Sequence, residues 1–251
     1  MTVFRVSLIA LALMFVALVT SRAPAGLVAA GLAHSGPGLS FSGVKGTLWR
    51  GTISNVVMGQ IPVGEVAYRL RPLSLFGLSP ALDLTLSQGA IVGRIPVQIS
   101  RRRVALGRGT LKLRLDAVSQ TRALGMPVSG VVDVTVDRLV FSPAGGCLEG
   151  ALTVATDFLK APAARWGAQG FDMAGPGGCE DGGLYVNLSG EGPDAAADLA
   201  LTMRQDFSFA VDVAVKPGRR DVRQALELIG FQQTGSALTY STSGALRKIA
   251  L

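Results

Sequence analysis

Regular alternation of apolar with polar or small side chains is the feature of this sequence that most restricts its fold. A half-buried β-strand has this period of two, because successive side chains point to opposite faces of a sheet. The clearest runs are residues 82–88, 91–100, 110–118, 129–141, 150–158, 183–189, 198–203 and 207–215, with earlier candidates at 39–58 and 64–72. From residue 39 onward, the sequence therefore predicts about ten strands.

Short connections join these runs, which favours an antiparallel sheet. The chain holds 32 glycines and 12 prolines, and both residue types suit tight turns. Parallel strands would need crossovers of about a dozen residues or more. Helices are expected only at residues 25–33, 159–167 and 221–228, the last with Asp221 as its cap and Gly230 near its end. We predict a mainly β fold, an extended and curved antiparallel sheet with few short helices.

An apolar segment near the amino terminus predicts a transmembrane helix ahead of this sheet. Residues 6–21 carry no charge and lie between Arg5 and Arg22, and a spanning helix needs about 20 apolar residues. We interpret the segment as an uncleaved signal-anchor that leaves the following domain exported. A cleaved signal peptide is the first alternative, although Pro24 disfavours its cleavage site. A buried helix is the second alternative.

The two cysteines agree with an exported domain. Cys147 and Cys179 are the only two in the chain, both in glycine-rich sequence that suggests turns, and neither belongs to a CxxC motif. With no histidine near them, a zinc site is not expected. In an oxidising compartment we expect a disulfide between them. Two free thiols are the alternative.

Charge divides the chain into two opposite halves. Residues 45–122 hold 12 basic and 3 acidic side chains, whereas residues 123–215 hold 4 basic and 12 acidic ones. The halves could attract each other, or the basic half could face anionic lipid headgroups or an acidic partner. Arg101–Arg103 with Arg108 form the densest basic patch, and a solvated hairpin end is the plainest explanation for it. Aromatic residues are only 6% of the chain, so we expect no nucleic-acid partner.

No motif in the sequence organises a catalytic site. The single histidine, His34, has no acidic neighbour in sequence, and no HExxH, P-loop, GxGxxG, EF-hand loop or GxSxG motif occurs. Ser42 and Lys45 form an SxxK pattern, but its usual SDN and KTG companions are missing. We therefore expect that the protein is not an enzyme and has no catalytic residue, cofactor or metal.

Two motifs carry a resemblance to a known family. The first is Gly46-Thr47-Leu48-Trp49 with Gly51, where we expect a strand with a buried tryptophan, and the second is Tyr68 with Pro72. With the short amino-terminal anchor, the chain length and the late cysteine, they resemble protein N of the bacterial type II secretion system. Tyr68 stands where a tryptophan is expected, which keeps an aromatic ring.

The resemblance implies an accessory subunit in the inner membrane that supports export of folded periplasmic proteins through the secretin, without catalysis or a cofactor. Its partners would be other secretion subunits, in the inner-membrane platform and at the secretin. The implied organisation is an anchor at 1–24, a juxtamembrane segment at 25–38 and a periplasmic β-rich domain at 39–251. The sheet also resembles the groove domains of AsmA-like envelope proteins. That alternative implies a protein that binds or transfers lipid.

Overall fold

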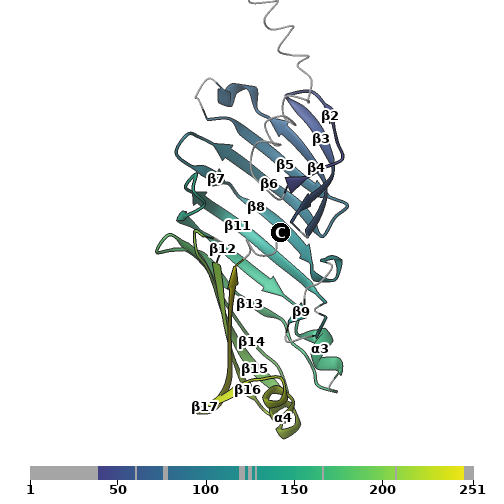
Figure 1. Ribbon diagram of the computed structural model, residues 1–251, viewed down its shortest axis with the longest axis vertical. Coiled ribbons are helices and arrows are strands. Elements are labelled where there is room, and N and C mark those ends of the chain that lie inside the picture. Colours follow the sequence, from purple (N-terminus) through teal and green to yellow (C-terminus); the bar gives the residue numbers. More distant parts are fainter. Residues whose placement is uncertain are drawn as a thin grey trace, which may run out of the picture.

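One large antiparallel sheet makes up most of the protein (Figure 1). The computed structural model describes residues 39–245 except 60, 76–78, 119–121, 124–125, 128, 166 and 207. The predicted anchor, the juxtamembrane segment with its expected helix, and His34 lie outside the described residues. In the described part, no helix combines the length and the apolar character needed to cross a membrane.

The large sheet has sixteen strands among the described residues, against the ten or so expected. They are β1 (Leu39–Ser40), β2 (Gly43–Gly46), β3 (Arg50–Met58), β4 (Ile61–Leu70), β5 (Ala81–Ser87), β6 (Ile91–Ile99), β7 (Val104–Leu106), β8 (Gly109–Arg114), β11 (Val131–Phe141), β12 (Cys147–Thr156), β13 (Met173–Glu180), β14 (Gly183–Glu191), β15 (Ala195–Met203), β16 (Ser208–Pro217), β17 (Gln232–Thr234) and β18 (Ala237–Ala245).

The remaining elements are small. They are a separate pair of strands, β9 (Arg122–Ala123) and β10 (Met126–Pro127), the 3-10 helices η1 (Pro72–Leu75) and η2 (Leu115–Ala117), and the α-helices α3 (Lys160–Arg165) and α4 (Arg220–Leu228). The predicted mainly β, antiparallel fold with few short helices is therefore confirmed.

The strand order of the sheet follows the chain almost without exception. It runs β1-β3-β4-β5-β6-β7-β11 and then from β12 to β16, ending with β18 and β17; β2 pairs beside β3, and β8 lies with β7 between β6 and β11. Every pairing is antiparallel. In Figure 1 the strands up to β12 are seen face-on and those from β13 nearly edge-on, so the sheet is strongly twisted and curved.

The pairing register collects the apolar side chains on one face. One cross-strand row consists of Val66, Leu86, Gly93, Leu111, Val134, Val154 and Gly175. A second row consists of Val136, Leu152, Gly177, Val186, Leu201, Val211 and Thr242. The intervening residues face the other way and are mostly polar or small, because side chains alternate along each strand. We call the two sides the apolar face and the polar face.

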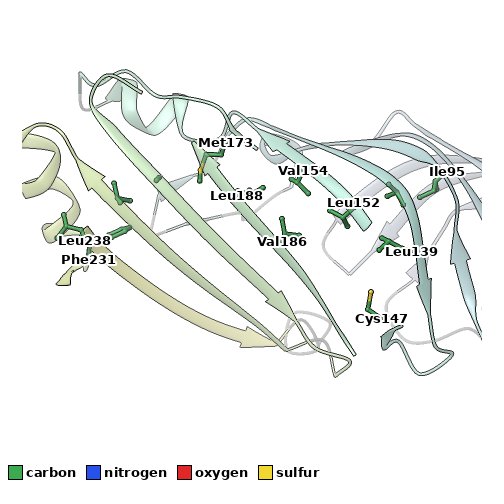
Figure 2. Close-up of a cluster of buried hydrophobic side chains, with 13 residues drawn as sticks. Ile95, Leu139, Cys147, Leu152, Val154, Met173, Val186, Leu188, Phe231 and Leu238 are labelled. Carbon is green, nitrogen blue, oxygen red and sulfur yellow. The ribbon is translucent and has the colours of Figure 1, made fainter. Parts of the chain in front are cut away.

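The curvature of the sheet buries much of the apolar face without a second layer among the described residues. Figure 2 shows the main cluster along the curved ribbon, from Ile95 to Leu238 and Phe231. Val136, Met173 and Leu238 are 1–2% exposed. A smaller cluster gathers under β3 and β4, and Leu84 packs against both clusters. The two clusters therefore form one continuous apolar surface.

The expected helices at 159–167 and 221–228 are present as α3 and α4. The expected cap was wrong: Arg219 precedes α4, and Asp221 lies in the first turn, where its carboxylate accepts from the Arg219 guanidinium and the Val222 N–H. α4 packs near β16 and β18, with Leu226 and Ile229 against the main cluster. One end of the apolar face is thereby covered.

Candidate interaction surfaces

The glycine-rich motif of the sequence builds the hairpin between β2 and β3. Gly46 pairs with Gly51, and the Thr47 N–H donates to the Arg50 carbonyl over 2.8 Å. Trp49 lies in the bend between these strands and is half-buried, so the expectation of a buried tryptophan within a strand was wrong. Its carbonyl accepts from the Leu70 N–H over 2.7 Å, which ties the bend to β4.

Tyr68 explains why this hairpin needs glycine. Its hydroxyl donates to the Thr47 carbonyl over 2.7 Å, and burial raises the pKa of the phenol. A Cβ on Gly51 would stand 2.7 Å from the Tyr68 hydroxyl oxygen and 2.5 Å from the Lys45 carbonyl. Gly46 has a φ of 110°, a conformation that residues with a side chain avoid. The structure thus brings Gly46, Thr47, Gly51 and Tyr68 together in one packing unit.

Leu48 and Pro72 complete the motif at its margins. Leu48 lies half-buried in the same bend, and Pro72 opens η1 one residue after the end of β4. Arg71, between β4 and η1, holds Asp83 of β5 in a two-pronged hydrogen bond of 2.9 and 2.6 Å. That contact depresses the pKa of the Asp83 carboxyl and raises the pKa of Arg71. The motif therefore organises backbone packing around three neighbouring strands.

The two cysteines form a disulfide, as the sequence predicted. It joins the first residue of β12 to β13, at the place where the ribbon turns from face-on to edge-on in Figure 1. The expected turn location was wrong for Cys179, which lies within β13, one residue before its end. Cys147 is 3% exposed, and its N–H donates to the Gly182 carbonyl over 2.9 Å. The disulfide thus reinforces the bend of the sheet.

Ion pairs join the basic and acidic halves across β8 and β11. Lys112 lies 2.9 Å from Asp133, and Arg108 lies 3.6 Å from Asp137. Both pairs are largely exposed, so each contributes only about 1 kcal/mol or less. The two halves therefore do meet through opposite charges, which is one of the outcomes that the sequence left open.

The arginine run lies in the turn between β6 and β7. Arg101–Arg103 are all exposed and make no ion pair with any residue that the structure describes. Ile99, at the end of β6 beside them, is 41% exposed. This turn is a free cationic corner next to the apolar face.

Metal-ligating side chains do not gather in the described part of the chain. No group of three or more His, Cys, Asp or Glu residues there could hold a metal ion. In the SxxK pattern, Ser42 is engaged by neighbours: its hydroxyl donates to the Ser54 carbonyl over 3.2 Å and accepts from the Asn55 amide over 3.0 Å. These hydrogen bonds therefore hold Ser42 in the corner between β2 and β3.

Sequence reasoning missed the strand that ends the sheet. β18 reads ALTYSTSGA, in which only Leu238 and Tyr240 are large and apolar, so its alternation is weak. The signal was nevertheless there, because Leu238, Tyr240, Thr242 and Gly244 occupy alternate positions. β17 covers only its beginning, by pairing with Ala237–Thr239. The described sheet therefore ends on a partly uncovered strand.

Fold and surfaces together define a β protein built on a large antiparallel sheet with one polar and one apolar face. The model of the family described as type II secretion system (T2SS), protein N matches residues 37–239. The chain belongs to this family, and it is a component of the type II secretion system associated with the cell envelope. No match was found among curated proteins or among solved structures.

Proposed function

We propose that the protein is an accessory inner-membrane subunit of the type II secretion system. It supports export of folded proteins from the periplasm by contacting other subunits, in the inner-membrane platform or at the secretin. It is held by a single span at residues 1–24, carries its sheet in the periplasm and catalyses no reaction.

The observation that carries this proposal is the open polar face. Its side chains are exposed on several strands of the large sheet, as at Thr135, Thr153, Asn187 and Asp212. Its charge is ordered along the strands, with a free cationic corner at Arg101–Arg103 and acidic strands beyond β11. Such ordering orients one protein against another more than it adds affinity.

The test is deletion and complementation in the bacterium that carries this chain. Without the protein, folded substrates of the system should accumulate in the periplasm, and the unsubstituted chain should restore secretion. The affinity-tagged chain should also retain platform subunits after mild solubilisation. Full secretion without the chain, together with no retained subunit, would contradict the proposal.

Location is tested separately. An alkaline phosphatase fused after the β domain should be active, because that enzyme matures only outside the cytoplasm. An inactive fusion at normal expression would place the domain in the cytoplasm. Sequencing the amino terminus of the purified protein should find residues 1–24 retained.

A lipid-handling role is the second candidate, and the apolar face favours it. Half-buried apolar side chains continue along this face between the two clusters, and Ile99 reaches the surface beside Arg101–Arg103. Acyl chains could lie on such a face with an anionic headgroup at the arginines. Stoichiometric phospholipid extracted from the purified protein would favour this role, and its absence would leave the contact role alone.

A further inference from the structure

The outer edge of β18 is open over most of its length. β16 pairs with all of β18 on one side, from Leu238 to Ala245. On the other side β17 ends at its pairing with Thr239. No residue that the structure describes pairs with the outer edge of Tyr240–Ala245. Among the described residues, a stretch of extended backbone is therefore left without a neighbouring strand.

The β17–β18 hairpin identifies which backbone groups point outward. Thr234 pairs with Ala237 across a two-residue turn in which Gly235 has a φ of 61°. The pair that closes such a turn exchanges both of its hydrogen bonds. The backbone N–H and C=O groups of Ala237 therefore point toward the edge that carries β17. The backbone groups of every second residue after Ala237 point to that same edge. Along the uncovered part, the N–H and C=O groups of Ser241, Ser243 and Ala245 point outward.

The same alternation assigns the other residues of β18. Tyr240, Thr242 and Gly244 direct their backbone groups toward β16, opposite Val213, Val211 and Phe209. An independent hydrogen bond agrees with this alternation, because the Ser208 carbonyl accepts from the Arg204 N–H. The backbone groups of Ser208 therefore face β15, and those of its neighbour Phe209 face β18. The open edge thus offers donors and acceptors only at odd-numbered positions.

This edge lacks the usual protection against pairing. Natural edge strands are shortened, bulged, charged or covered, because an exposed ladder accepts another strand. From Tyr240 to Ala245 β18 has no charged residue and no proline, and its pairing with β16 shows no register shift. Free backbone groups in this geometry are satisfied by an extended polypeptide, whereas an acyl chain offers them no hydrogen bond.

We infer that the outer edge of β18, at Ser241, Ser243 and Ala245, binds an extended segment of another polypeptide by strand addition. This inference rests on the proposed function and names the surface of one of its contacts. The segment is about five or six residues long, since β17 limits the site at Thr239. It carries apolar side chains at alternate positions, which continue the apolar face next to Tyr240 and Thr242.

A second copy of the chain fits this edge poorly. Antiparallel pairing of two β18 edges sets outward-facing residues opposite one another, so Ser243 meets Ser243 of the copy and Ser241 meets Ala245. Thr242 then lies opposite Gly244 of the copy, and neither is a large apolar residue. The copy would therefore continue the apolar face poorly. The partner is therefore another polypeptide.

The experiment places a photo-crosslinking amino acid at Ser243 of the full chain, expressed in its own bacterium with the secretion system intact. Ser241→Pro is then added, which removes one outward N–H and leaves the pairing with β16 in place. We expect an adduct with another polypeptide whose crosslinked segment alternates apolar residues, and a loss of that adduct of about tenfold or more with Ser241→Pro. The same probe at Met58, exposed at the other end of the sheet, should give no such adduct.

Three results would overturn the inference: no adduct at position 243, an adduct that Ser241→Pro leaves unchanged, or an adduct with a second copy alone. Thermal unfolding of the Ser241→Pro chain checks its fold, and Ala245→Pro provides the same test if that variant unfolds. Co-purification of secretion subunits with the unsubstituted chain is scored separately. Retained subunits with an unaffected adduct would reject this edge while leaving the proposed function standing.

Discussion

The two ends of the large sheet are built in opposite ways. At the amino-terminal end, β3 is covered by two short strands, β1 and β2, and its pairing with β4 shifts register around Asn55 and Val56. At the carboxyl-terminal end, the residues that the structure describes cover only the first third of a regular strand of nine residues. One end is divided into short, irregular pieces, whereas the other presents a longer and more regular edge.

The difference shows that protection of an edge strand against further pairing is local in this fold and comes from particular residues. Gly46 with its positive φ, Lys45 on the outermost strand and the left-handed Asn55 disrupt the first edge. None of these features occurs in the second half of β18. An unprotected edge accepts another strand. Its presence in an envelope protein of a secretion system therefore favours a role for this edge in binding.

Among the changes considered, removal of the disulfide should lower the free energy of unfolding most. Replacing both cysteines by serine frees a loop with a sequence separation of 32 and should lower the free energy of unfolding by about 3–4 kcal/mol in the chain-entropy model. Thermal unfolding with and without reductant measures the loss, and the double variant serves as the reductant-insensitive control. If both ends belong to one cooperative sheet, a single transition shifts. Two separate transitions would contradict that unity.

Proline substitutions in β18 should separate its inward and outward positions. Thr242→Pro removes an N–H that faces β16 and leaves a carbonyl unpaired, so we expect a loss of about 2–4 kcal/mol in the free energy of unfolding. Ser243→Pro removes only an outward N–H and should change stability by about 0.5 kcal/mol or less. Chemical denaturation of the two variants measures this. Equal losses would show that the assigned parity is wrong.

Gly46→Val should weaken the protected end alone. A Cβ at this position would stand 2.5 Å from the Arg50 carbonyl oxygen, in a backbone region that valine avoids. We expect a cost of about 1–3 kcal/mol and faster amide exchange in β2, with β18 unchanged. Gly59→Ala, a positive-φ glycine with open space around it, controls for strain without crowding. Slower amide exchange in β2 would contradict the inference that close packing at Gly46 requires a glycine.

Lowering the pH should have the smallest effect on stability, because it protonates Asp83 on the polar face. The Arg71 guanidinium depresses the pKa of this carboxyl in the folded protein. The stabilisation is therefore present above the ordinary carboxyl pKa and is lost as the pH falls through the depressed value. Because the pair is exposed, we expect about 1 kcal/mol or less. Asp83→Asn should abolish this part of the pH dependence; an unchanged acid profile would show that the pair contributes nothing.

The sequence predicted the antiparallel sheet, both helices of the described part and the disulfide, because strong alternation and clear turn residues marked them. It missed β13, whose glycines resemble a turn. In the folded sheet these glycines allow close approach: a Cβ on Gly175 would lie 1.9 Å from the Asn187 carbonyl oxygen. It also missed β18, where serine, threonine and glycine dilute the apolar pattern. The local signal of such strands is weak, and their pairing partners identify them more clearly.

The most direct test of the central claim is amide hydrogen exchange along β18 in the isolated protein, read residue by residue. We expect alternation along the strand: the amides of Tyr240, Thr242 and Gly244 exchange slowly, whereas those of Ser241, Ser243 and Ala245 exchange quickly and become protected when a partner strand binds. Uniform protection across Tyr240–Ala245 in the isolated chain would mean that the edge is already covered. The claim that β18 is open for a partner would then be wrong.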